Sequence, residues 1–353
     1  MKKVYCKSKR DYLDDYSHLE SKNIDMTLSG KYLYKYPFKF VYKYEYDKYP
    51  SSKEINKLID SIAKKYKVDL SSKSIILGSG TNGLIQNIIK VLFSKDKGNL
   101  VTSYLTFNQA EYAVSSLGSE TKRVYLKDNY QISLENMDYS IDNNTKLVYI
   151  CNPNNPTGIL LKNKDIINFA NRHKKTYIII DESNLEYSNE ESLISKKFPS
   201  NLIILKGFSK AYGLANMRIG YMVCSKTFKN KYLKLTTVNE FSGLSCILAD
   251  KVINSNYYLK NVELIKKERI YLKNELEQLN IKIIESKSNT LMTETTFDEK
   301  FMIKLANNDI SVVPIIDERK RLHIRIAVQD RKTNRKFIHN LKNCLDNEKN
   351  MLL

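Results

Sequence analysis

The most informative part of this chain is the run Gly207-Phe208-Ser209-Lys210-Ala211-Tyr212-Gly213-Leu214-Ala215-Asn216-Met217-Arg218-Ile219-Gly220-Tyr221. Lys210 directly follows Ser209 in a mostly apolar segment, and Arg218 comes eight residues later. A lysine amine can bind an aldehyde covalently, while a serine hydroxyl and a guanidinium can both bind a phosphate. One small molecule that carries both groups is pyridoxal 5'-phosphate, so we expect this cofactor. A surface lysine beside a turn is the alternative, but it leaves the spacing of the serine and the arginine unexplained.

Length and composition limit the class of protein. A chain of 353 residues suits a large domain with a smaller one beside it. No apolar run reaches the roughly 18 residues that a membrane span needs, and no apolar stretch follows the basic start of the chain. We therefore expect a cytoplasmic protein with no membrane partner. Disulfides and a zinc site are not expected, because the cysteines are widely spaced and form no CxxC pair. They are Cys6, Cys151, Cys224, Cys246 and Cys344.

The formal net charge of +19 raises the question of a nucleic-acid partner. The lysines are scattered along the whole length and do not cluster, so solvated surface lysines are the simpler account and no nucleic-acid partner is expected. The basic field could still attract anionic, phosphorylated substrates, and this hypothesis predicts a salt-dependent rate.

Short β-rich runs alternate with helical stretches between Ser74 and Val223, which predicts an α/β domain with a largely parallel sheet. A helix is expected over 82–93, because its apolar residues repeat with the spacing of one helix face. The expected strands are 74–77, 99–102, 122–126, 146–151, 176–181, 202–206 and 219–223.

After Thr227 the pattern changes to long charged helices, clearest over 262–279, followed by β-rich pieces at 311–316 and 321–328. The first part of the chain is rich in tyrosine and lysine and shows little periodicity. We therefore expect three parts. They are an N-terminal arm over 1–45, a large cofactor-binding domain over 46–226, and a smaller α/β domain over 227–353.

A glycine-rich segment, Gly78-Ser79-Gly80-Thr81-Asn82-Gly83, lies between the first expected strand and its helix. Backbone N–H groups at a helix N-terminus bind phosphate, aided by the helix dipole. The pattern is also a GxGxxG, but a dinucleotide fold needs an acidic residue at the end of the next strand. That strand ends in Thr102-Ser103-Tyr104-Leu105-Thr106-Phe107, with no acid. The phosphate of a smaller cofactor fits better.

Two further motifs follow strands, where an open α/β sheet binds its ligand. Cys151-Asn152-Pro153-Asn154-Asn155-Pro156-Thr157-Gly158 forms a rigid turn in which Asn155 could present its amide to the ring hydroxyl of the cofactor. Asp181 ends an apolar strand, where a carboxylate needs a cationic partner such as a protonated pyridine nitrogen. A plain strand-to-helix connection and an ordinary N-cap aspartate are the alternatives.

Together, NPNNPTG, Asp181 and FSKAYGLANMRIGY give the chain a resemblance that runs from about Tyr46 to Val328. It resembles the class I/II aminotransferases of the fold-type I pyridoxal-phosphate superfamily, and among them histidinol-phosphate aminotransferases and their threonine-phosphate decarboxylase relatives. The resemblance implies a large domain with a mostly parallel seven-stranded sheet. It also implies that Lys210 forms the Schiff base and carries protons, that Asp181 pairs with the pyridine nitrogen and that Asn155 binds the ring oxygen.

The same resemblance assigns the other contacts of the cofactor and the substrate. It implies that Phe107 stacks on the cofactor ring. Tyr49, in Tyr49-Pro50, would reach the phosphate in the neighbouring subunit, which implies a homodimer with shared active sites. Arg325 would bind the substrate carboxylate bidentately, through two parallel N–H groups of its guanidinium. The phosphate itself would be held by Gly80, Thr81, Asn82, Ser209 and Arg218.

Three departures from the family pattern bear on the reaction, and one of them is that the N-terminal arm has Leu28-Ser29-Gly30-Lys31 roughly where many relatives have Asn-Glu-Asn-Pro. Asn184 stands where a tyrosine usually binds the ring oxygen, so we place it among the substrate-binding residues, and Gly207 replaces a common phosphate-binding hydroxyl residue. We favour amino transfer from an amino-acid donor such as glutamate to a small phosphorylated carbonyl compound. Decarboxylation of a phosphorylated amino acid remains the alternative. A non-catalytic descendant is disfavoured, because the lysine, the aspartate and the arginine are all retained.

Overall fold

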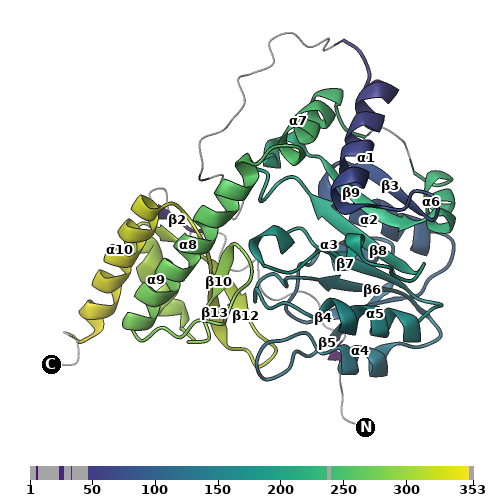
Figure 1. Cartoon of the computed structure of the whole chain (residues 1–353). Helices are drawn as coiled ribbons and strands as arrows, with labels where there is room; N and C mark the ends of the chain where they lie inside the picture. Colours follow the sequence, from purple (N-terminus) through teal and green to yellow (C-terminus); the bar gives the residue numbers. More distant parts are fainter. Residues whose placement is uncertain (1–4, 7–23, 28–32, 34–46, 237–239, 350–353) are drawn as a thin grey trace.

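The computed structural model describes residues 5–6, 24–27, 33, 47–236 and 240–349 (Figure 1). Its large sheet has eight strands in the order β1-β5-β4-β6-β7-β8-β9-β3. The strands from β5 to β8 in this order are mutually parallel, and β9 is antiparallel to both β8 and β3. They are β1 (Tyr5–Cys6), β3 (Lys73–Gly78), β4 (Asn99–Ser103), β5 (Glu120–Val124), β6 (Thr145–Cys151), β7 (Tyr177–Asp181), β8 (Leu202–Gly207) and β9 (Gly220–Ser225).

The mostly parallel seven-stranded sheet is confirmed, since each expected strand overlaps an observed one and the two-residue β1 is an addition at the edge. The strand expected at 122–126 is β5, which begins two residues earlier. Its charged residues are buried as ion pairs, Lys122 with Asp142 and Arg123 with Glu111, so the apolar pattern of the sequence misplaces the strand.

Helices cover both faces of the large sheet. Strand residues alternate between the faces, so Ile179 packs on one side while Ile178 and Ile180 pack on the other. The first face is covered by α2 (Gly80–Phe93), α3 (Gln109–Ser116) and α6 (Lys226–Leu233). The second face is covered by α1 (Ser52–Tyr66), α4 (Leu134–Ser140) and α5 (Asn163–Arg172).

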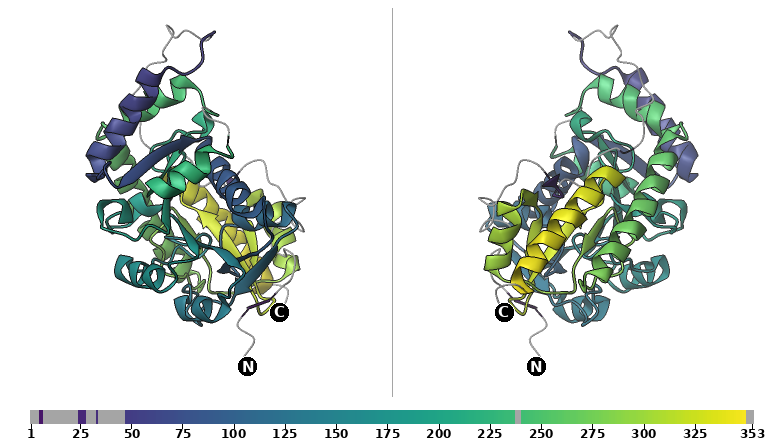
Figure 2. Two further views of the ribbon diagram at one scale, coloured as in Figure 1. Left: turned by 90° about the vertical axis from the view of Figure 1, so that its right-hand side faces the viewer. Right: turned by 90° about the vertical axis from the view of Figure 1, so that its left-hand side faces the viewer.

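Helix α7 (Gly243–Ile253) packs on α1, and α8 (Tyr257–Gln278) runs diagonally from there to a second, smaller sheet (Figure 1). This sheet has the order β10-β13-β12, with β10 (Thr290–Met292), β12 (Val313–Ile316) and β13 (Leu322–Ala327). Helices α9 (Glu299–Asn307) and α10 (Arg331–Lys349) complete this part of the molecule. The right-hand view of Figure 2 shows this part of the molecule facing the viewer, with α10 in front.

The N-terminal segment contributes one element to the smaller part of the molecule. Strand β2 (Ile24–Asp25) pairs in parallel with β11 (Ile310–Ser311), and the N–H group of Ala327 donates to the Met26 carbonyl at 2.7 Å. Most of the arm expected over 1–45 lies outside the described residues. The three-part division of the chain therefore stays a prediction.

The structure bears on membrane-spanning helices and on disulfides only for the residues that it describes. Within the described ranges, no helix is long and apolar enough to cross a membrane. The four cysteines whose side chains are described are buried free thiols.

Candidate active site

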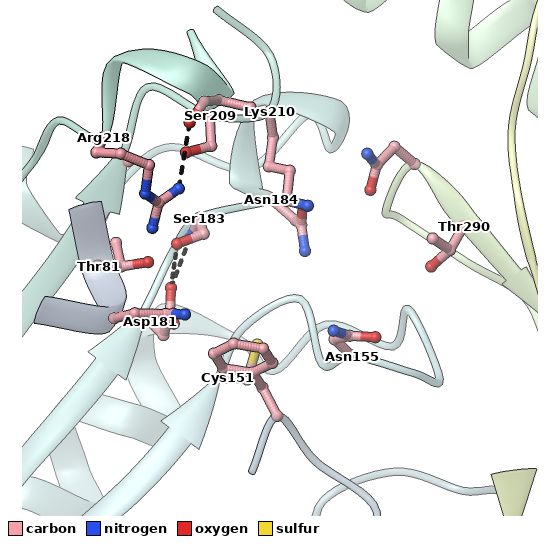
Figure 3. A pocket seen from close by; sticks show the side chains of 15 residues that line it. Thr81, Cys151, Asn155, Asp181, Ser183, Asn184, Ser209, Lys210, Arg218 and Thr290 are labelled. Atoms are coloured by element: carbon pink, nitrogen blue, oxygen red, sulfur yellow. Dashed lines mark hydrogen bonds between the residues drawn. The ribbon is translucent and has the colours of Figure 1, made fainter. Parts of the chain in front are cut away.

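A cavity of about 280 Å³ lies at the carboxyl ends of β6, β7 and β8, beside the N-terminus of α2 (Figure 3). This is the edge at which an open α/β sheet binds its ligand. Its walls come from the large sheet and, on the far side, from β10. The lining residues are Thr81, Asn82, Phe107, Cys151, Asn155, Asp181, Ser183, Asn184, Gly207, Ser209, Lys210, Ala215, Arg218, Asn289 and Thr290.

Lys210 reaches this cavity from a tight loop after β8. The loop is held by two backbone hydrogen bonds, from Gly213 to the Lys210 carbonyl at 3.0 Å and from Leu214 to the Phe208 carbonyl at 2.8 Å. Burial lowers the pKa of the Lys210 amine to about 8, with the Arg325 and Arg218 charges adding to the effect. The neutral, nucleophilic amine is therefore accessible near neutral pH, as an aldehyde-binding lysine requires.

Asp181 ends β7 and is only 2% exposed. Its Oδ1 accepts a hydrogen bond from the Ser183 N–H group at 2.9 Å and another from the Ser183 hydroxyl, and its Oδ2 accepts one from the Tyr149 hydroxyl at 2.9 Å. Burial raises the pKa of Asp181, while the bonds from Ser183 and Tyr149 act in the opposite direction. Burial also raises the pKa of Tyr149, so the phenol keeps its proton and remains a donor.

The N-terminus of α2 and Arg218 form a polar cup at one end of the cavity. Gly80 has a φ of +67°, and a Cβ at this position would lie 3.0 Å from Arg218 Nη2, so only glycine lets the guanidinium approach the helix so closely. Arg218 is oriented by a 3.2 Å bond from Nη1 to the Ala215 carbonyl. The cup also includes the lining residues Thr81, Asn82 and Ser209.

Asn155 and Arg325 are joined directly. Arg325 donates from Nη1 to Asn155 Oδ1 at 3.1 Å and from Nη2 to the Thr27 carbonyl at 3.0 Å. The first bond fixes the orientation of the Asn155 amide and leaves its N–H₂ group to donate elsewhere in the cavity. Arg325 thus lies beside the cavity and connects the N-terminal segment, the large sheet and β13.

The structure brings together almost every site residue expected from sequence, Phe107 and Asn184 included. Tyr49 is the exception, because it lies just before α1, is 94% exposed and does not line the cavity. Its expected role belongs to a neighbouring subunit and is not tested by a single chain.

Several residues of the site were not predicted from the sequence. Ser183 is two residues after Asp181 and closes a local turn on its carboxylate, a pattern that the sequence could have revealed. Tyr149 lies two residues before Cys151 on the same face of β6, and the register Cys151↔Asp181 brings its hydroxyl to the carboxylate. Asn289 and Thr290 come from β10 and its approach, and no local pattern places them in this cavity.

These features match the groups that bind pyridoxal phosphate. A lysine with a lowered pKa faces the cavity and suits the aldehyde, and a buried carboxylate suits the cationic ring nitrogen. A cup of hydroxyl, N–H and guanidinium groups suits the phosphate. Phe107 supplies an aromatic face on the wall of the same cavity.

Comparison with known proteins points the same way. Residues 42–341 match the family model "Aminotransferase class I and II". The histidinol-phosphate aminotransferase of Macrococcus caseolyticus is 29% identical over 304 residues, which is 84% of this chain and 82% of that protein. That of Bacillus subtilis is 36% identical over 166 residues, 45% of each chain.

Among solved structures, histidinol-phosphate aminotransferase from Sinorhizobium meliloti in complex with pyridoxal-5'-phosphate superposes with a TM-score of 0.78. The match covers 85% of this chain and 83% of that one at 20% identity. At this level of identity the likeness establishes a common fold.

Proposed function

Because the chain belongs to the class I and II aminotransferases, which work with pyridoxal 5'-phosphate, we propose that it moves an amino group from glutamate to a small phosphorylated carbonyl compound. The observation that carries the proposal is the convergence of Lys210, Asp181 and Arg218 in one cavity, with Arg325 beside it. The names of the relatives support the ketone that corresponds to histidinol phosphate as the phosphorylated acceptor, with histidinol phosphate itself as the donor in the reverse direction.

In this proposal each residue has a defined task. The bound cofactor supplies an electron sink for the charge that develops at the substrate Cα. Lys210 would bind the cofactor aldehyde and, once displaced by the substrate amine, would act as base and then as acid on the proton of the substrate Cα, a role that suits a pKa of about 8. Asp181 would keep the ring nitrogen of the cofactor protonated, and Phe107 would supply the aromatic face for the ring.

The remaining residues of the site bind and orient. Asn155 donates its amide N–H to the ring oxygen, because its Oδ1 is already occupied by Arg325. Arg325 binds the anionic group of the substrate, for which a guanidinium offers two parallel N–H donors. Asn184 contacts the substrate. The phosphate of the cofactor is held by Gly80, Thr81, Asn82, Ser209 and Arg218.

The assembly and the location are part of the same proposal. We infer a cytoplasmic homodimer in which Tyr49 acts on the cofactor phosphate of the second subunit. The support is that Tyr49 is almost fully exposed on a single chain. A tyrosine this exposed can contact a second copy without any rearrangement of its own subunit.

The test is to incubate the cofactor-loaded protein with histidinol phosphate and 2-oxoglutarate and to measure glutamate. Formation of glutamate supports the proposal. In a parallel incubation, O-phosphothreonine is added alone and carbon dioxide is measured. Release of carbon dioxide from O-phosphothreonine, with no glutamate formed in the first reaction, would contradict amino transfer and favour decarboxylation. The names of the relatives, which are aminotransferases, do not favour that alternative.

A further inference from the structure

Two buried oxygens in the cavity have no hydrogen-bond partner within the part of the chain that the structure describes. They are Asn184 Oδ1 and Thr290 Oγ1. Asn184 is 8% exposed and Thr290 is 3% exposed, and both residues line the cavity. Figure 3 shows them on facing sides of it, Asn184 near Lys210 and Thr290 at the start of β10. The cavity therefore has one unsatisfied polar group on each of two opposing walls.

The separation of these two walls is fixed by Arg269 of α8. Its Nη1 donates to the Tyr187 carbonyl at 3.2 Å and to the Ser288 carbonyl at 2.6 Å. Tyr187 lies in the turn that follows Asn184, and Ser288 comes two residues before Thr290. One guanidinium thus ties together the two segments that carry the unsatisfied oxygens.

A second set of bonds holds the wall that carries Thr290. The Lys287 N–H group donates to the Gly158 carbonyl at 2.8 Å, and the Ser286 hydroxyl donates to the Thr290 carbonyl at 2.6 Å. Gly158 ends the turn that carries Asn155, so the turn after β6 holds this segment at the site itself. The position of Thr290 is therefore built into the fold.

A buried polar atom that has no partner lowers stability, so a bound molecule that offers a hydrogen bond to each of these oxygens gains affinity. The cofactor already has groups for its ring nitrogen, its ring oxygen and its phosphate in Asp181, Asn155 and the cup at Gly80. The partner of Asn184 and Thr290 must then be the substrate. An amide oxygen accepts a hydrogen bond, and a hydroxyl both donates and accepts.

We propose that Asn184 and Thr290 form a polar subsite that selects substrates by their side chain, an inference that rests on the proposed amino transfer. The subsite takes a side chain with a hydroxyl, amide or imidazole N–H group. It disfavours an apolar side chain of the same shape, because only a polar side chain gives the two oxygens the hydrogen-bond partners that they lack. A site built to bond a polar group discriminates far more strongly than an apolar pocket does.

The test compares two ligands of nearly equal shape, α-methyl-L-asparagine and α-methyl-L-leucine, on the cofactor-loaded protein. Neither has a hydrogen on Cα, so calorimetry measures binding without amino transfer. Both carry a carboxylate, so the contribution of Arg325 cancels in the ratio of the two dissociation constants. We expect the asparagine analogue to bind about tenfold or more tightly than the leucine analogue.

Variants assign the preference to the two residues. Thr290→Val keeps the shape of the side chain and removes the hydroxyl, and Asn184→Leu removes the amide; each should reduce the ratio at least about threefold. Thr290→Ser, which keeps the hydroxyl, should retain the ratio. Each variant is first checked for its content of bound cofactor, so a change in the ratio is not confused with loss of the cofactor.

Equal or reversed affinities in the unaltered protein would overturn the subsite, and that comparison does not depend on whether any variant folds. A ratio unchanged in both Thr290→Val and Asn184→Leu would overturn the assignment to these residues. Failure of the proposed function looks different. In that case no glutamate forms from histidinol phosphate and 2-oxoglutarate, while the binding ratio is still measured.

Discussion

At the residue scale, the chemistry depends on a lysine whose amine is easily deprotonated. Burial and the charges of Arg325 and Arg218 lower the pKa of Lys210 to about 8, from an ordinary value more than two units higher. The neutral amine, which attacks the cofactor aldehyde, is scarce below this pKa and predominates above it. We therefore expect the rate of cofactor attachment to the cofactor-free protein to rise about tenfold per pH unit below pH 8 and to level off above it.

Removal of the nearby cation should move this profile. Arg325→Gln raises the pKa of Lys210, so the midpoint shifts to higher pH, as rapid-mixing absorbance would show. Arg319→Gln is the control, since Arg319 pairs with the exposed Asp128 and not with the site. A rate that does not change between about pH 6 and pH 10 would refute the assigned pKa.

Tyr149 offers a second test at this scale. Its hydroxyl donates to the buried carboxylate of Asp181, and a hydrogen bond to a charged group contributes about 1.5–3 kcal/mol. Tyr149→Phe should raise the pKa of Asp181 further and weaken cofactor binding about tenfold or more, measured by equilibrium dialysis. Tyr232→Phe is the matched control, a buried tyrosine whose hydroxyl bonds Asn87 instead. Equal cofactor affinity in the two variants would argue against the role of Tyr149.

At the scale of elements, the turn after β6 meets the segment before β10 at Gly158. Its φ is +73°, and an added Cβ would lie 2.1 Å from Ser286 Oγ and 3.0 Å from Ser286 Cα. Gly118 has a similar φ of +67° but open surroundings, with the nearest atom at 3.9 Å. Both Gly→Ala variants lose stability because alanine is strained in a left-handed backbone conformation. Only Gly158→Ala also creates a steric clash.

Urea unfolding should separate these two costs. We expect Gly118→Ala to lose about 1–2 kcal/mol of unfolding free energy. Gly158→Ala should lose about 1–3 kcal/mol more, because the packed neighbours must move. Equal losses in the two variants would mean that the close packing of Gly158 against Ser286 does not contribute to the unfolding free energy.

The elements themselves were largely predictable. The runs that form β6, β7 and β8 are largely apolar, so their places in the chain and those of Asp181 and Lys210 follow from local pattern. Helix α2 begins two residues before the expected start, because Gly80 and Thr81 already belong to its first turn. The bounds of β5 were predicted wrongly, because the buried ion pairs of Lys122 and Arg123 give this strand no apolar signature.

At the scale of the whole molecule, contacts between distant parts of the chain were not predictable. Arg325 bonds Asn155, 170 residues away, and Thr27, 298 residues away. Arg269 holds Tyr187 and Ser288 in the same manner. These contacts depend on how the smaller sheet lies against the large one, and residue patterns within one element carry no information about that.

The net charge of +19 gives a prediction for the whole molecule. A basic field should accelerate the encounter with phosphorylated substrates, and salt should weaken this effect. We expect kcat/KM for histidinol phosphate to fall several-fold between about 0.02 and 0.3 M salt. The kcat/KM for an amino-acid donor whose side chain is uncharged should fall much less. The same dependence for both substrates would exclude steering by charge.

The central claim, that Lys210 holds pyridoxal phosphate, is tested most directly by mapping the site of attachment. The cofactor-loaded protein is reduced with borohydride and digested, and the labelled peptide is identified by mass spectrometry. We predict that the visible absorbance band disappears on reduction and that the phosphopyridoxyl label is on Lys210, with none in Lys210→Ala. A label on another lysine, or no label in a protein that has bound the cofactor, would contradict the account.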